Sequence, residues 1–157
     1  MKNKKLIREQ LDNKIIKYRG LQKVALPPNG WIYSIRQGIN MSLRQLGQRL
    51  SITPQSVKEV EEREKNGTIS LKVLRQVADA LDMDFVYGFV PRENTLEAMV
   101  TKKAKELATR IVERTSIQMG LEDQKNTDER IEKAINERTD EIKRELPRYL
   151  WDLNLNI

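Results

Sequence analysis

The sequence contains no cysteine and no histidine, and aromatic residues make up only 5% of its 157 residues. These absences exclude disulfides, Cys/His zinc sites and iron–sulfur clusters. They also exclude Ser-His-Asp and Cys-His catalytic centres and a histidine general base. Among the remaining residue types, the sequence shows no recognisable nucleophile–base arrangement and no Gly-rich phosphate loop. We therefore expect that the protein is not an enzyme and has no cofactor and no metal ion.

Long apolar runs are also missing. No run approaches the roughly 20 apolar residues that cross a bilayer, and no stretch of signal-peptide length follows the N-terminus. Together with the lack of cysteine, this predicts a cytoplasmic protein without a membrane partner. Charged residues make up 33% and hydrophobic residues 38% of the chain, which is typical of a soluble, helix-rich protein of one or two small domains.

Positive charge is concentrated at one end of the chain. The sequence has 29 Lys and Arg against 23 Asp and Glu, which gives a formal net charge of +6. Residues 1–30 hold eight basic and two acidic residues, whereas residues 31–91 carry a net charge of +1 and residues 92–157 one of −1. A basic end is typical of a protein that binds a polyanion, either nucleic acid or a membrane surface, and equally of a solvated helix face.

Apolar spacing and turn residues predict four regions. Residues 1–26 form a basic N-terminal helix, because apolar residues recur there at helical spacing. Residues 27–30 read Pro-Pro-Asn-Gly and form a linker. Residues 31–91 contain several short helices and form the second domain. Residues 92–157 contain two longer amphipathic helices, which either mediate dimerisation or partner binding or complete the core of the monomer.

Two segments have the composition or the period of a strand. Phe85–Val90 is apolar, aromatic and β-branched, lies between Asp84 and Pro91, and predicts a short strand. The tail from Trp151 to Ile157 alternates apolar and polar residues, which is the period of a strand. Its candidate partners are Phe85–Val90 and a sheet edge of another chain.

Two short helices within residues 31–91 carry the main functional signal. Leu43–Leu50 and Pro54–Glu64 are separated by only three residues. Ser42 and Gln45 form a capping box before the first helix, and Thr53 precedes the second. The apolar residues Leu46, Leu50, Ile52, Val57 and Val60 are expected to face inward. This pattern is typical of a helix-turn-helix, whose second helix enters the major groove of DNA; an ordinary helical hairpin is the alternative.

The sequence also resembles a known class of DNA-binding domain. Met41–Glu61 is similar to the Cro/repressor-like (XRE-type) helix-turn-helix, and Ser70–Leu81 matches the signature of its fourth helix. The resemblance covers residues 31–89, and Gly47 stands where alanine is usual. It implies a mainly α, lambda-repressor-like domain. The whole chain would then comprise this domain, a basic N-terminal helix, a short strand and a C-terminal helical region.

A narrower resemblance extends over nearly the full chain. Pro27–Ile32, Ile69–Leu71, Val86–Pro91, Gln118–Glu122 and Leu150–Asp152 resemble the family called mobile mystery protein A. Its members are often encoded beside a Fic-type protein. The resemblance therefore implies an autoregulatory repressor, or an antitoxin-like partner of a Fic-type toxin.

Specific residues of the second helix are candidates for reading bases. Gln55, Lys58 and Glu59 lie on its outer N-terminal face, and Ser56 lies where it would touch a base or a phosphate. Gln can pair with adenine, Lys with guanine, and Glu with the amino group of cytosine. The alternative for these residues, and above all for Glu59, is a solvated helix face.

Other residues at the helix ends are candidates for contacts with the DNA backbone. They are Ser42, Leu43 (through its backbone N–H), Arg44, Thr53, Arg63, Lys65 and Asn66. We expect the partner to be a palindromic double-stranded operator that a homodimer binds, because dimers of such domains read two half-sites.

The resemblance to Cro/repressor-like domains also implies a structural ion pair. In these domains an Arg of the first helix often pairs with a Glu near the end of the recognition helix, and Arg36 and Glu61 fall on those positions. We predict a partly buried Arg36–Glu61 pair.

An antitoxin that inhibits a toxin without binding DNA is the alternative function. Small Fic inhibitors carry a helix with a Ser/Thr-x-x-x-Glu-Gly/Asn motif. Thr109 and Glu113 have this spacing, but Arg114 follows where the motif has Gly or Asn. An ordinary amphipathic helix also accounts for the segment.

Overall fold

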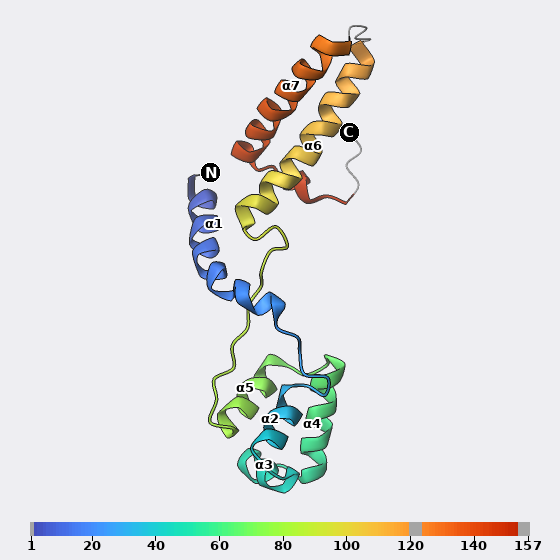
Figure 1. Cartoon of the computed structure of the whole chain (residues 1–157). Coiled ribbons are helices and arrows are strands. Elements are labelled where there is room, and N and C mark those ends of the chain that lie inside the picture. Colours follow the sequence, from blue (N-terminus) through green and yellow to red (C-terminus); the bar gives the residue numbers. More distant parts are fainter. Residues whose placement is uncertain (1, 120–123, 154–157) are drawn as a thin grey trace. The chain divides into compact units, whose positions relative to one another are not determined.

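The computed structural model describes residues 2–119 and 124–153, and every regular element in these ranges is a helix (Figure 1). The mainly helical fold expected from the composition is therefore confirmed. The chain divides into two compact units, one made of Lys23–Gly88 and the other of Met1–Gln22 together with Phe89–Ile157. No helix among the described residues is both long and apolar enough to span a bilayer.

The unit Lys23–Gly88 is built from short helices whose starts follow the sequence signals. They are α2 (Trp31–Gly38), α3 (Leu43–Leu50), α4 (Pro54–Asn66) and α5 (Leu71–Ala80). The side-chain oxygens of Ser42, Thr53 and Ser70 accept hydrogen bonds from N–H groups of the first turns of α3, α4 and α5. The predicted capping box before α3 is present, and Gly67 ends α4 in the left-handed conformation. Local capping chemistry thus defines the starts of α3, α4 and α5, as the sequence predicts.

One apolar core holds this unit together. Its buried members come from all four helices and from the residue after α5: Ile32, Leu46, Val57, Val60, Val77 and Leu81. Leu46 and Val57 have no exposed surface and lie on α3 and α4. Burying such a side chain contributes about 1.5–3 kcal/mol each, so α4 is fixed against α3 by its inner face.

The turn between α3 and α4 is closed by backbone rather than by an apolar side chain. A Cβ atom at Gly47 would lie 2.7 Å from the carbonyl oxygen of Ile52. This close approach explains why glycine stands in α3 despite its low helix propensity. Ile52 is 37% exposed and is not among the residues that pack against the core, so the prediction that it faces inward is wrong.

The predicted strand Phe85–Val90 is wrong. This segment has no regular secondary structure, and Val86 and Phe89 are 67% and 85% exposed. A strand needs a neighbour for its backbone hydrogen bonds, and the ranges 2–119 and 124–153 contain no other strand. The composition of a segment shows only that its residues suit a sheet, not that a neighbouring strand is present. The rings of Phe85 and Tyr87 instead stack with their centroids 5.8 Å apart.

The predicted tail strand lies partly outside the described residues. Trp151 ends a short 3-10 helix, η2 (Arg148–Trp151), and does not begin a strand. Residues 154–157 are not described.

The second unit joins the N-terminal helix to the two long C-terminal helices. It contains α1 (Lys2–Ile15), α6 (Leu96–Met119), α7 (Gln124–Glu145), η2 and all but the last residue of η1 (Ile16–Lys23), the 3-10 continuation of α1. α6 and α7 lie side by side (Figure 1) around a core that includes Ala104, Leu107, Ala108, Ile142 and Leu150. The sequence predicts residues 1–26 and residues 92–157 as two distinct regions. The structure places α1 in the same compact unit as α6 and α7.

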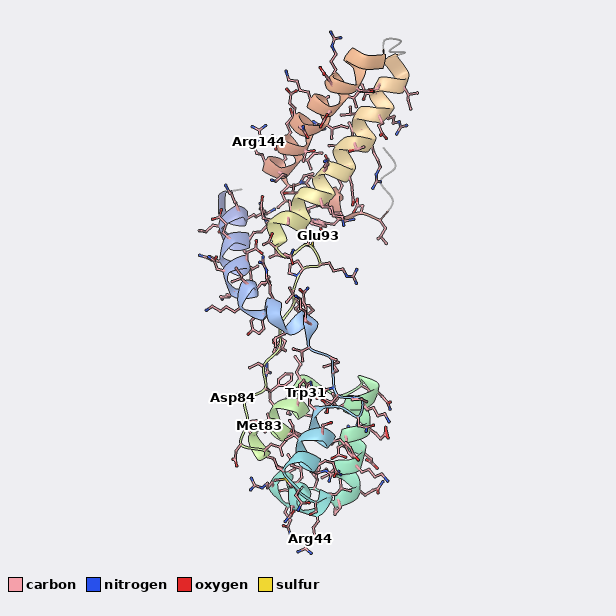
Figure 2. The ribbon with its side chains drawn as sticks, viewed as in Figure 1. Trp31, Arg44, Met83, Asp84, Glu93 and Arg144 are labelled. Carbon is pink, nitrogen blue, oxygen red and sulfur yellow. The ribbon has the colours of Figure 1, made fainter. Side chains whose placement is uncertain are left out.

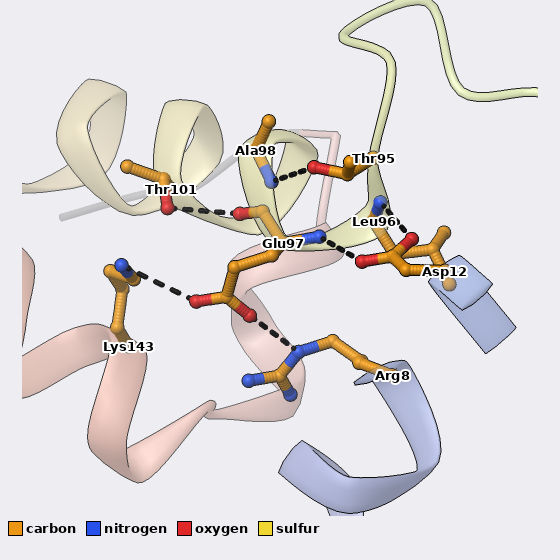
Figure 3. Close-up of polar contacts among 8 residues, drawn as sticks. All are labelled: Arg8, Asp12, Thr95, Leu96, Glu97, Ala98, Thr101 and Lys143. Atoms are coloured by element: carbon orange, nitrogen blue, oxygen red, sulfur yellow. Dashed lines mark hydrogen bonds and ion pairs between the residues drawn. The ribbon is translucent and has the colours of Figure 1, made fainter. Parts of the chain in front are cut away.

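α1 is attached to α6 by polar side chains (Figure 3). The carboxylate of Asp12 accepts hydrogen bonds from the backbone N–H groups of Leu96, at 2.7 Å, and Glu97, at 3.3 Å. The hydroxyl of Thr95 accepts the next one, from Ala98 at 2.9 Å. The first N–H groups of a helix have no partner within it, so Asp12 completes the N-terminus of α6 from a helix more than 80 positions away in the chain.

We expect Asp12→Ala to loosen α1 from α6, because two N–H groups of α6 would lose their acceptor. Loss of such a capping side chain costs about 0.5–2 kcal/mol. Hydrogen–deuterium exchange should become faster at the amides of Leu96 and Glu97 and along α1. Asp12→Asn keeps one side-chain oxygen and should show a smaller effect. Equal exchange in the wild type and in Asp12→Ala would contradict this role.

Candidate nucleic-acid interface

α4 is held against α2 by a buried ion pair. Nε of Arg36 lies 2.6 Å from Oε1 of Glu61, and a second guanidinium nitrogen lies 3.3 Å from Oε2. Both side chains are only 8% exposed. Arg36 also donates to the carbonyl oxygen of Met41 at 3.0 Å, and its guanidinium lies 5.5 Å from the centroid of the Tyr33 ring. The structure therefore contains the pair that the sequence predicts, and the same arginine also ties down the chain just before α3.

A second carboxylate of α4 caps α2, and sequence reasoning missed it. The carboxylate oxygens of Glu64 accept hydrogen bonds from the N–H groups of Trp31, at 3.1 Å, and Ile32, at 2.8 Å. A Cβ atom at Gly30 would lie 2.6 Å from this carboxylate, and Gly30 has a φ of 85°. The sequence offered one signal for this contact: the N-cap residue of α2 is Gly30, which has no side chain to cap the helix. The free N–H groups of a helix start without a local cap are available to a distant acceptor or to water.

These two contacts leave the opposite face of α4 open. Gln55, Lys58 and Glu59 are exposed, and Ser56 is half-buried. An open groove of about 410 Å³ follows this face, lined by Gln55, Lys58, Glu59, Glu62 and Arg63. The structure thus brings three of the four candidate base-reading residues together with one candidate phosphate contact.

Thr53 and Ser56 already form hydrogen bonds with each other at the N-terminus of α4. The Oγ1 atom of Thr53 accepts the N–H of Ser56 at 3.1 Å, and the two hydroxyl oxygens lie 2.9 Å apart. Both side chains therefore hold the first turn of α4 in place. A contact from Thr53 or Ser56 to DNA would use the hydrogen-bonding capacity that remains on each hydroxyl.

The candidate backbone contacts at the start of α3 differ in whether their hydrogen-bonding groups are free to reach DNA. Ser42 is engaged in the capping box, with its N–H 2.8 Å from Oε1 of Gln45. Leu43 packs against the core, and its backbone N–H, at the first position of α3, has no partner within the helix. Arg44 is exposed and points away from the helices of its unit (Figure 2).

The remaining candidates lie at the end of α4. Arg63 and Lys65 occupy its last turn, Asn66 is its final residue, and all three are exposed. Lys58 and Lys65 line a second, smaller groove of about 190 Å³ with Asn29, Tyr33, Glu61 and Glu62. Two basic and two acidic side chains line the groove along α4. This face is therefore suited to hydrogen-bonded recognition more than to general attraction of a polyanion.

Comparisons of the chain with family models, with curated proteins and with solved structures find no match. The case for a function therefore depends on the residues and geometry of the chain itself, together with the sequence resemblance described above.

Proposed function

We propose that the protein is a sequence-specific DNA-binding transcriptional regulator, in which α3 and α4 act as a helix-turn-helix. One observation carries the proposal. The inner face of α4 is fixed by Val57, Val60 and Glu61, while Gln55, Lys58 and Glu59 are exposed on its outer N-terminal part. A recognition helix needs this division, since the base-reading side chains must project from a helix that does not move.

The residues have separate roles in this proposal. Gln55 and Lys58 are the principal base-reading residues, because their side chains can make bidentate or charged contacts with purines. Glu59 accepts from cytosine and rejects other bases, and Ser56 adds a short contact. Arg44, Arg63, Lys65 and Asn66, with Thr53, Ser42 and the N–H of Leu43, position the domain on the sugar–phosphate backbone.

The wider biological role rests on the sequence resemblance. We propose that the protein binds a palindromic operator as a homodimer and acts as an autoregulatory, antitoxin-like repressor beside a Fic-type toxin. The described part of the chain offers no observation in favour of an inhibitor that acts without DNA. Within α6, the hydroxyl of Thr109 donates to the carbonyl oxygen of Lys105 at 2.7 Å, as in an ordinary amphipathic helix.

Selection of duplexes from a random pool with the full-length protein tests this proposal. We expect enrichment of one motif with two-fold symmetry, whose half-sites are about 10 base pairs apart. The same selection with Gln55→Ala/Lys58→Ala should lose the motif. A wild-type pool that is still random after repeated rounds at low salt would refute the proposed function.

A further inference from the structure

A basic groove lies within the unit formed by α1, α6 and α7. It has a volume of about 640 Å³. Its cationic side chains are Lys4, Lys5 and Arg8 from α1 and Lys143 and Arg144 from α7; the other lining residues are Glu97, Asp140 and Leu146. Arg144 projects from α7 (Figure 2). Two helices that are more than 100 positions apart in the sequence thus contribute five cations to one open space.

Glu97 forms ion pairs with two of the five cations of the groove (Figure 3). Its carboxylate lies 3.1 Å from Nε of Arg8 and 3.4 Å from Nζ of Lys143. Partial burial raises the pKa of Glu97, but the hydrogen bonds and charges of Arg8 and Lys143 outweigh burial and hold this pKa below its usual value. Glu97 therefore stays ionised at neutral pH and joins α1 to α7.

Three cations of the groove are left over. Lys4, Lys5 and Arg144 form no ion pair with any residue in the described ranges 2–119 and 124–153, and all three are exposed. Arg144 makes only a long hydrogen bond, 3.4 Å, from Nε to the carbonyl oxygen of Asp140. Like charges brought together repel each other unless an anion lies between them. Asp140 also lines the groove and forms no ion pair within the described ranges, so its unpaired side chains are three cations and one carboxylate. This excess of positive charge attracts an anion from outside.

The chemistry of the lining favours phosphate. Arginine binds phosphate through two parallel hydrogen bonds, and lysine binds it as a point charge. Leu146 is the single apolar residue that lines the groove, and no aromatic side chain lines it. Small-molecule sites are mostly apolar with a few polar groups, and unpaired bases bind by stacking on aromatic rings. Every lining side chain of this groove except Leu146 is charged and none is aromatic, which favours a backbone of repeated phosphates over a nucleotide or an unpaired base.

We propose that the groove between α1 and α7 binds phosphates of the duplex DNA backbone, independently of sequence. This inference rests on the proposed function and adds to it a second DNA contact outside the unit that contains α4. It also assigns a role to the excess of positive charge in residues 1–30, most of which lies outside the unit that contains α4. The contact adds affinity equally to every duplex and leaves discrimination between sequences to α4.

The test measures how the affinity of the full-length protein for a random-sequence duplex depends on salt. Each phosphate contact contributes about 0.9 to the slope of log affinity against log salt concentration. We expect Lys4→Gln/Lys5→Gln/Arg144→Gln to reduce the magnitude of this slope by about 2–3. The variant keeps Arg8, Glu97 and Lys143, so the helix packing remains, and circular dichroism should match that of the wild type.

A variant that loses the same number of positive charges outside the groove distinguishes the effect of the groove from the effect of total charge. Lys105→Gln/Arg110→Gln/Lys133→Gln removes two lysines and one arginine from exposed positions on α6 and α7 outside the groove. Its salt slope should equal that of the wild type. An unchanged slope in the groove variant, or equal decreases in both variants, would overturn the proposal.

Inorganic tripolyphosphate distinguishes the two sources of phosphate. If the groove variant loses tripolyphosphate binding in calorimetry while its duplex binding is unchanged, the ligand is a free polyphosphate and the proposed DNA contact is refuted. If the wild type binds no duplex at low salt, the proposed function itself fails. If the wild type binds and the groove variant has the same slope, only the groove proposal fails.

Discussion

Glu61→Ala should lower the free energy of unfolding of the unit Lys23–Gly88 by about 3–5 kcal/mol. The substitution leaves the guanidinium of Arg36 buried without its carboxylate, at a position where both side chains are only 8% exposed. The lost contacts are the two hydrogen bonds at 2.6 and 3.3 Å that join α2 to α4. A buried charge without its partner is much less stable than the same charge in water.

Urea denaturation followed by tryptophan fluorescence measures this effect. Trp31 belongs to the unit with α4 and Trp151 to the other unit. In a Trp151→Phe background the fluorescence therefore reports on Trp31 alone. Glu62→Ala, at an exposed neighbouring position, should change the free energy of unfolding by less than about 0.5 kcal/mol.

A double substitution tests whether the cost comes from the unpaired charge. Arg36→Met/Glu61→Leu removes both charges and should be less destabilising than Glu61→Ala alone, because no charge stays buried without a partner. If Glu61→Ala changes stability no more than Glu62→Ala, the pair does not hold α4 in place. The structural basis of the proposed recognition helix would then be wrong.

Gln55→Ala and Lys58→Ala should each weaken binding to the selected duplex by about 1–3 kcal/mol, or roughly 5- to 150-fold. Both side chains are exposed, so their loss should not alter the stability of the unit. Each variant should also accept more bases than the wild type at one position of each half-site, because its base contact is gone. Fluorescence anisotropy with the selected duplex and its single-base variants measures both effects at one salt concentration.

The chain offers a matched control on α5. Lys72 and Gln76 are exposed on this helix of the same unit, and Lys72→Ala/Gln76→Ala removes the same two residue types. Its affinity for the selected duplex should stay within a factor of about two of the wild type. Equal losses in the α4 and α5 variants would show that α4 does not read the DNA.

Features of the fold that depend on local chemistry were predictable from the sequence. Ser42, Thr53 and Ser70 cap helices because a side-chain oxygen reaches an N–H group three residues later. The Arg36–Glu61 pair was predictable only through the resemblance to Cro/repressor-like domains. Glu64 was not predicted, because its partners at the start of α2 lie more than 30 positions away in the chain.

The position of α1 shows a different limit of sequence reasoning. Helical spacing identifies an apolar face of α1, but Ile7 and Leu11 on that face are 46% and 41% exposed. The side-chain hydrogen bonds that attach α1 to α6 come from Arg8 and Asp12. Periodicity shows that a helix has an apolar face, but not which face packs within the same chain. The strand prediction at Phe85–Val90 was wrong for a related reason, since strand composition does not supply a partner strand.

The central claim is that α4 reads a DNA sequence. Its most direct test compares the affinities of the full-length protein for the selected duplex and for a scrambled duplex of equal length and composition, at one salt concentration near 150 mM. The account predicts that the selected duplex binds at least about 1,000-fold more tightly, as specific DNA-binding proteins do. Equal affinities for the two duplexes would contradict the claim.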